Sequence, residues 1–151
     1  LWGNPGATDE DIWQALKMAQ AEEFVSKLPE GLDTPVNQGG KNFSGGQRQR
    51  LTIARALVRR PEIVIMDDSA SALDFATDLK LRTAIRHDLT DTTAFIVSQR
   101  ATSVRHADLI IVLDGGVPVG MGRHDELMRT CDVYREIVHS QEDKEGQHDD
   151  K

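Results

Sequence analysis

The stretch NFSGGQRQRLTIARALVRRPEIVIMDDSASALD, Asn42 to Asp74, decides the fold of this chain. It opens with a Ser-Gly-Gly turn, continues with apolar residues at helical spacing as far as Pro61, and then runs through four apolar residues into two adjacent carboxylates. The spacing predicts a helix from about Gly46 to Arg59, and the apolar run predicts a buried strand over 63–66. A buried strand that ends in carboxylates calls for a partner to those charges, usually a cation.

Further helices and strands flank this stretch. Before it, Thr8 and the acidic residues that follow predict a helix start, and apolar spacing extends that helix to about Lys27. After it, the pattern predicts a helix over 75–89, a strand over 93–97, a short helical turn, a strand over 109–113, a hairpin turn at 114–116, a short strand over 117–121 and a final helix over 125–140. Apolar strands that alternate with helices indicate an α/β protein whose parallel sheet is covered on both faces, with function at the carboxyl ends of its strands.

Composition excludes some classes of protein. The chain has 151 residues with 38% apolar content, enough for one compact domain with a real core. Its net charge of -7 argues against nucleic-acid binding, which needs a surplus of Lys and Arg. No run approaches the roughly 18 apolar residues that span a bilayer. The single Cys131 cannot form an internal disulfide, and we expect it to be packed rather than reactive. The first residue is Leu1 rather than Met, so we expect a piece of a longer protein.

Two parts of the deciding stretch carry chemistry. Ser44, Gly45 and Gly46 stand at the start of a predicted helix, where backbone N–H groups and the helix dipole suit a phosphate. Glycine is needed there because a side chain would keep the ligand's oxygens away from the backbone. Asp67 ends the predicted strand, a position from which an Asp typically holds Mg²⁺ through water.

Together these residues resemble the nucleotide-binding domain of an ATP-binding cassette (ABC) exporter. Ser44-Gly45-Gly46-Gln47 is similar to the signature motif, 63–67 to Walker B, and 71–74 to the D-loop. The segment TPVNQGG, 34–40, resembles the exporter X-loop, which touches coupling helices of the membrane domain. The resemblance spans Asn4 to Gln141 and implies a partial P-loop NTPase (RecA-like) core with a parallel sheet, together with the ABC α-helical subdomain.

The resemblance also implies a division of the chain and a set of site residues. Residues 1–60 would form the helical subdomain with the X-loop and signature, 61–140 the C-terminal part of the ATPase core, and 141–151 a disordered acidic tail. ATP and Mg²⁺ are the implied cofactors, with Asp67 as the metal residue and Asp68 and Gln99 in catalytic positions. The implied nucleotide contacts are Phe43, Ser44, Gly45, Gly46, Gln47 and Asp74.

Two positions depart from the strongly hydrolytic members of the family. Asp68 stands where those members have a Glu that polarises the attacking water, and its side chain is one methylene shorter. Gln99 stands in the switch region, where a His normally contacts the γ-phosphate, and Gln can neither carry a positive charge nor shuttle a proton. With an intact signature, these changes imply the degenerate-site half of a heterodimeric exporter, whose partner subunit supplies Glu and His.

The sequence contains no phosphate-cradling G-x-x-x-x-G-K-S/T loop, which in the family precedes the segment that this chain matches. We therefore expect the isolated 151 residues to lack ATPase activity. The leading hypothesis is an ATPase subunit at the cytoplasmic face of the cell membrane, contacting a transmembrane domain through the X-loop. The alternatives are a regulatory nucleotide-binding module with little hydrolysis and a soluble ABC ATPase without a membrane domain.

Overall fold

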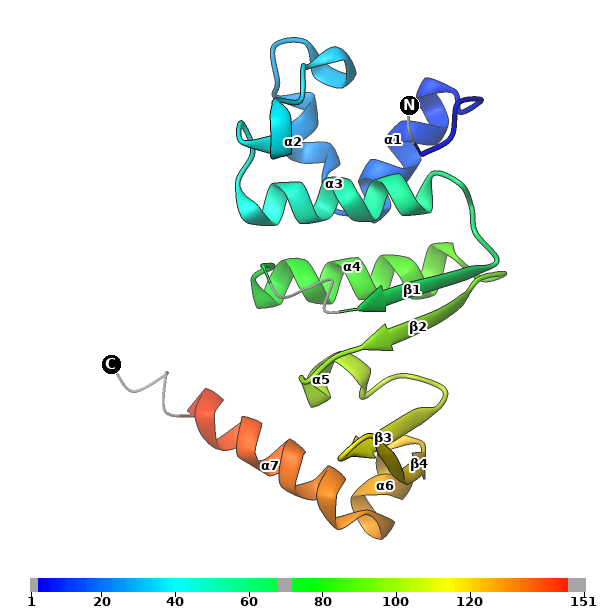
Figure 1. The fold of residues 1–151 in the computed structure, drawn as a ribbon, viewed down its shortest axis with the longest axis vertical. Helices are drawn as coiled ribbons and strands as arrows, with labels where there is room; N and C mark the ends of the chain where they lie inside the picture. Colours follow the sequence, from blue (N-terminus) through cyan, green and yellow to red (C-terminus); the bar gives the residue numbers. More distant parts are fainter. Residues whose placement is uncertain (1–2, 68–71, 147–151) are drawn as a thin grey trace. The chain divides into compact units, whose positions relative to one another are not determined.

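The computed structural model describes residues 3–67 and 72–146, and the order of their elements is shown in Figure 1. By compactness the chain divides into two units, Leu1–Phe95 and Ile96–Lys151. The division by motif into 1–60 and 61–140 is a separate assignment and stays a prediction. Among the described residues, no helix is both long and apolar enough to cross a membrane.

The first unit begins with helix α1, Asp9–Met18, which starts at a capping box. The Thr8 hydroxyl accepts the Asp11 amide at 3.2 Å, and the Asp11 carboxylate accepts the Thr8 amide at 3.1 Å. This satisfies backbone donors that the first turn leaves without helical partners. The predicted helix start is confirmed.

The predicted extension of this helix to Lys27 is wrong. The chain reverses at Gln20, which has a φ of 58°, and a separate helix α2 covers Glu22–Ser26. The Gln20 amide donates to the Lys17 carbonyl and the Ala21 amide donates to the Leu16 carbonyl, the pair of bonds that closes a helix end. Glycine usually occupies this position, so the sequence offered no stop signal.

Two single 3-10 turns, η1 over Gly31–Asp33 and η2 over Gln38–Gly40, lead into helix α3, Gly45–Leu57. Strand β1, Ile63–Asp67, follows, then helix α4, Phe75–Asp88, and strand β2, Thr93–Val97. β1 and β2 pair and run in the same direction, with α4 as the connection, so they form a parallel β-α-β arrangement (Figure 1). α3, β1, α4 and β2 match the predicted elements to within two residues at each end.

The prediction that both faces of the sheet are covered is wrong for this chain. In β1 the side chains of Val64 and Met66 are buried, whereas Ile63 and Ile65 are 60% and 70% exposed. Because side chains alternate along a strand, all the buried residues share one face. A continuous apolar run predicted two covered faces, but in this structure β1 has the alternating burial of a sheet with one open face.

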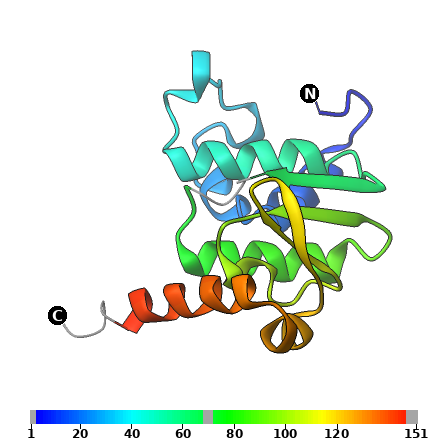
Figure 2. The same ribbon diagram turned by 60° about the horizontal axis from the view of Figure 1, so that its bottom comes forward.

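The second unit contains helix α5 (Ala101–Val104), strands β3 (Ile110–Asp114) and β4 (Val117–Gly122), and helices α6 (His124–Thr130) and α7 (Asp132–Gly146). β3 and β4 pair antiparallel. They are joined at Gly115 and Gly116, whose φ values of 56° and 80° are those of the tight hairpin turn that was predicted. Figure 2 shows this hairpin in yellow, with α6 and α7 following it in orange to red.

Two predictions about the end of the chain need correction. The helix expected over 125–140 is divided at Cys131, whose backbone is extended (φ −124°, ψ 106°). The tail expected to be disordered is helical over 141–146, because α7 continues through Gly146. Leu127 of α6 and Tyr134 and Val138 of α7 are buried in the core of this unit, together with Cys131 between the two helices. Cys131 is packed as expected.

Candidate nucleotide site

The start of α3 is built by a second capping box. The Ser44 hydroxyl accepts the Gln47 amide at 3.2 Å, and the Gln47 side-chain oxygen accepts the Ser44 amide at 2.9 Å. These reciprocal bonds fix the first turn of a helix of 13 residues, whose dipole places partial positive charge at Gly45 and Gly46. The predicted signature residues therefore lie together in one ordered turn.

The two glycines of this turn have different surroundings. A Cβ added at Gly46 would lie 3.1 Å from the Ala72 carbonyl oxygen, whereas one added at Gly45 would lie 4.0 Å from the Ala72 Cβ. Gln49, one turn along α3, accepts the Ala72 amide at 3.0 Å. The backbone at Ala72 thus leaves little room for a side chain at position 46, and this contact was not foreseen from the sequence.

Phe43 lies in the interior rather than on a ligand-facing surface. Its side chain is buried and packs edge-on against Phe24, with ring centroids 6.2 Å apart. Its carbonyl accepts the Arg48 guanidinium at 2.8 Å. Any contact of Phe43 with a nucleotide would therefore use its backbone.

Arg50 is a structural residue that sequence reasoning missed. Its guanidinium donates to the Gln20 carbonyl at 2.7 Å and lies 5.0 Å from the centre of the Phe24 ring. It thereby connects α3 to the chain reversal between α1 and α2. Nothing in the sequence pattern alone indicated this contact.

The loop that resembles the X-loop is held by Asn42. The Asn42 side chain donates to the Pro35 carbonyl at 3.0 Å and accepts the Asn37 amide at 3.1 Å. Gly39 and Gly40 within the loop have φ values of 69° and 65°, which favour glycine. The loop is therefore tied back onto the residue that precedes Phe43.

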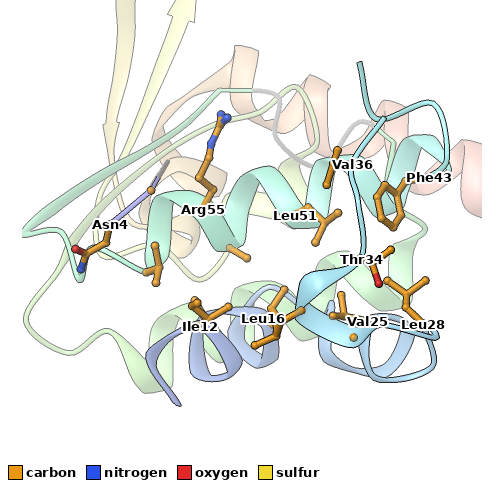
Figure 3. A pocket seen from close by; sticks show the side chains of 16 residues that line it. Asn4, Ile12, Leu16, Val25, Leu28, Thr34, Val36, Phe43, Leu51 and Arg55 are labelled. Carbon is orange, nitrogen blue, oxygen red and sulfur yellow. The ribbon is translucent and has the colours of Figure 1, made fainter. Parts of the chain in front are cut away.

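The helical part of the first unit contains a cavity of about 230 Å³, shown in Figure 3. Its lining is mainly apolar, and the buried Thr34 hydroxyl has no hydrogen-bond partner among the described residues. Phe43 lines the cavity, but Ser44, Gly45 and Gly46 do not. The cavity and the start of α3 are therefore separate features.

The predicted carboxylates differ in their surroundings. Asp67 lies at the end of β1 with an exposed side chain. Asp68 lies outside the described residues. Asp74 caps α4, accepting the Thr77 amide at 2.9 Å and the Thr77 hydroxyl at 2.7 Å. These bonds, the backbone one first, hold the pKa of the Asp74 carboxyl below its usual value of 3.8. In this structure Asp74 is thus occupied as a helix cap.

Gln99 belongs to the second unit and has an exposed position between β2 and α5. Its carbonyl accepts the side-chain amide of Gln141 at 2.7 Å, and the N–H of the same peptide unit, on Arg100, donates to the Ser98 hydroxyl at 3.0 Å. Asp67 and residues 44–47 belong to the first unit, so the predicted site residues are divided between the two units.

No group of three or more His, Cys, Asp or Glu side chains that could hold a metal exists among the described residues. A single exposed carboxylate such as Asp67 still fits Mg²⁺, because this ion keeps several waters and takes one or two carboxylates with phosphate oxygens.

Comparisons with known proteins identify the class. Residues 4–71 match the family model described as ABC transporter. An uncharacterized ABC transporter ATP-binding protein of Mycobacterium tuberculosis is 48% identical over 134 residues, covering 89% of this chain and 23% of that protein. The probable multidrug resistance ABC transporter ATP-binding/permease protein YheI of Bacillus subtilis is 44% identical over 142 residues, covering 94% and 24%.

A solved structure of a bacterial Atm1-family ABC exporter with ATP bound matches with a TM-score of 0.87 and 34% identity, over 93% of this chain and 25% of that one. This chain therefore corresponds to part of the ATP-binding domain of the ABC transporter family. It spans about a quarter of the length of the curated relatives it matches. The predicted family and the α/β fold with a parallel sheet are confirmed.

Proposed function

We propose that this chain is the C-terminal part of an ATP-binding domain in an ABC exporter, and that it supplies an intact signature to the ATP site of a partner subunit. The observation that carries the proposal is the capped first turn of α3, in which Ser44 and Gln47 bond each other around Gly45 and Gly46. This turn is ordered in advance for an anion, so little ordering cost remains when phosphate binds.

The chain's own site would bind ATP with Mg²⁺ but hydrolyse it slowly. Asp67 would hold the ion, which when bound offsets negative charge on the phosphates. Asp68 is one methylene shorter than the Glu that would polarise water, and general-base catalysis worth about 10²–10⁴-fold depends on reach. Gln99 can donate a hydrogen bond to a phosphate but cannot supply a charge or a proton relay.

The partner would be a second, different ABC subunit, and the pair would act on a transmembrane domain at the cytoplasmic face of the membrane. The relative named as an ATP-binding/permease protein supports a membrane-embedded part. Contact with that part would use the loop over 34–40, which Asn42 holds in place.

The experiment is reconstitution of the complete transporter with its partner subunit. Asp68→Glu combined with Gln99→His should raise ATP turnover at this chain's site, because both missing catalytic groups are restored. Ser44→Ala should instead reduce turnover at the partner's site by at least tenfold, and Ser140→Ala on the exposed surface of α7 serves as the control. Loss of all turnover in Asp68→Ala alone would contradict the assignment of a slow site.

A regulatory module that closes on ATP is the second candidate, favoured by the two departures at Asp68 and Gln99. It predicts negligible turnover in the complete complex with the native partner. Measurable native turnover that depends on the partner's Glu and His would exclude this candidate.

A further inference from the structure

The side chain of Gln141 bridges two backbone groups of the loop between β2 and α5. Its Nε2 donates to the Gln99 carbonyl at 2.7 Å, and its Oε1 accepts the Ala101 amide at 2.8 Å. A primary amide offers donors on one atom and an acceptor on the other, so one side chain satisfies both groups. Gln141 is 42 residues from Gln99, and it lies in a segment that the sequence predicted to be a disordered tail.

The position of Gln141 is fixed by the packing of α7. Tyr134 and Val138 on this helix are 3% and 7% exposed, and Val138 lies one turn before Gln141. The buried part of α7 therefore fixes the position of the Gln141 side-chain amide beside the loop between β2 and α5. The bond to the Gln99 carbonyl holds the peptide that follows Gln99, and the bond from the Ala101 amide holds the start of α5.

We propose that Gln141 is a positioning residue of the switch site, which fixes the backbone at Gln99 and thereby directs the Gln99 side chain toward the γ-phosphate of bound ATP. The inference rests on the proposed function of Gln99. The two hydrogen bonds of the Gln141 side chain reach backbone groups on either side of Arg100, so its effect on a bound nucleotide would pass through Gln99. If residues 141–151 formed the disordered tail that the sequence predicted, Gln141 could not hold this loop.

A positioning role of Gln141 and simple anchoring of α7 have different effects on nucleotide binding. ADP lacks a γ-phosphate, so a residue that acts through Gln99 affects ATP and leaves ADP unchanged. A residue that only stabilises the unit affects both nucleotides alike.

The test uses the complete transporter, with photolabelling of this subunit by azido-ATP and by azido-ADP. Gln141→Met keeps the length of the side chain and removes both bonds, and Ser140→Ala is the control on the adjacent position. Loss of a positioning hydrogen bond should weaken labelling by azido-ATP about three- to tenfold, with labelling by azido-ADP unchanged. Gln99→Ala should do the same, and adding Gln141→Met to it should cause no further loss.

Amide hydrogen exchange of the peptide covering 98–102 reports the bridge itself, and Gln141→Met should accelerate it while Ser140→Ala does not. An ATP-specific effect of Gln99→Ala with none from Gln141→Met overturns the inference and leaves the proposed function standing. Equal losses for azido-ATP and azido-ADP in Gln141→Met also overturn it. No nucleotide effect from Gln99→Ala overturns the proposed role of Gln99 and the positioning role with it.

Discussion

Gln20 adopts a left-handed backbone conformation (φ 58°) that side chains with a Cβ disfavour. Both closing bonds of α1 depend on this conformation, so the helix end carries a conformational cost. Gln20→Gly should raise the free energy of unfolding by about 1 kcal/mol, measured by denaturant unfolding. Gln20→Ala keeps the unfavourable Cβ and should bring no gain. Equal effects of the two substitutions would show that the backbone carries no strain.

At the start of α3, Gly46 is expected to matter for stability and Gly45 for nucleotide binding. Gly46→Ala places a Cβ 3.1 Å from the Ala72 carbonyl oxygen, whereas Gly45→Ala meets nothing closer than 4.0 Å. Overpacking costs about 1–3 kcal/mol, so the Gly46 variant should unfold at lower denaturant concentration than the Gly45 variant. Gly45→Ala should retain stability and still weaken ATP use at the partner's site. Equal stability of the two variants would contradict the close approach of Ala72.

At the scale of elements, the cap of α4 should make stability depend on pH. The folded-state pKa of Asp74 is lowered by its bonds from Thr77, so the cap stabilises the fold above the usual pKa of 3.8. That contribution is lost as the pH falls through the lowered folded-state value. Asp74→Asn keeps a capping oxygen without a titrating charge, so the free energy of unfolding should fall less steeply with acid. An identical pH dependence in both proteins would remove Asp74 from this role.

The sequence predicted elements with strong local signals and missed the breaks between helices. Thr8, Ser44 and the Asp114–Gly116 turn announce their structures through capping and turn chemistry, and the structure has them in place. The breaks at Gln20 and Cys131 carry neither Gly nor Pro, so the sequence shows no local stop signal at either position. Arg50, which holds the Gln20 carbonyl, is 30 residues away.

The same reasoning applies to the candidate site. Ser44 to Gln47 and Asp67 are recognisable because each lies within one short pattern. The bond from Gln141 to the Gln99 carbonyl and the bond from the Ala72 amide to Gln49 connect distant segments, and a single sequence holds no signal for such pairs. The sequence therefore predicted a disordered tail at Gln141, whose side chain bonds the backbone at Gln99 and Ala101.

At the scale of the whole molecule, the open face of β1 should make the separate 151-residue chain associate. Ile63 and Ile65 expose apolar surface beside a strand, and exposed apolar surface of this kind favours contact between copies. Ile65→Thr should lower the weight-average mass in sedimentation at a given concentration. Val36→Thr is the control, because Val36 is 66% exposed but lies on the loop before α3. A chain that stays monomeric at high concentration would contradict the expectation.

The turn at Gly115 and Gly116 has a consequence for the order of folding. β3 and β4 are neighbours in the chain, so their pairing closes a very short loop, and hairpins form in about 1–10 μs. β1 and β2 pair across the whole of α4, which requires a longer loop to close first. When the unfolded chain refolds, the short loop of the hairpin can therefore close before the longer loop between β1 and β2, which contains α4.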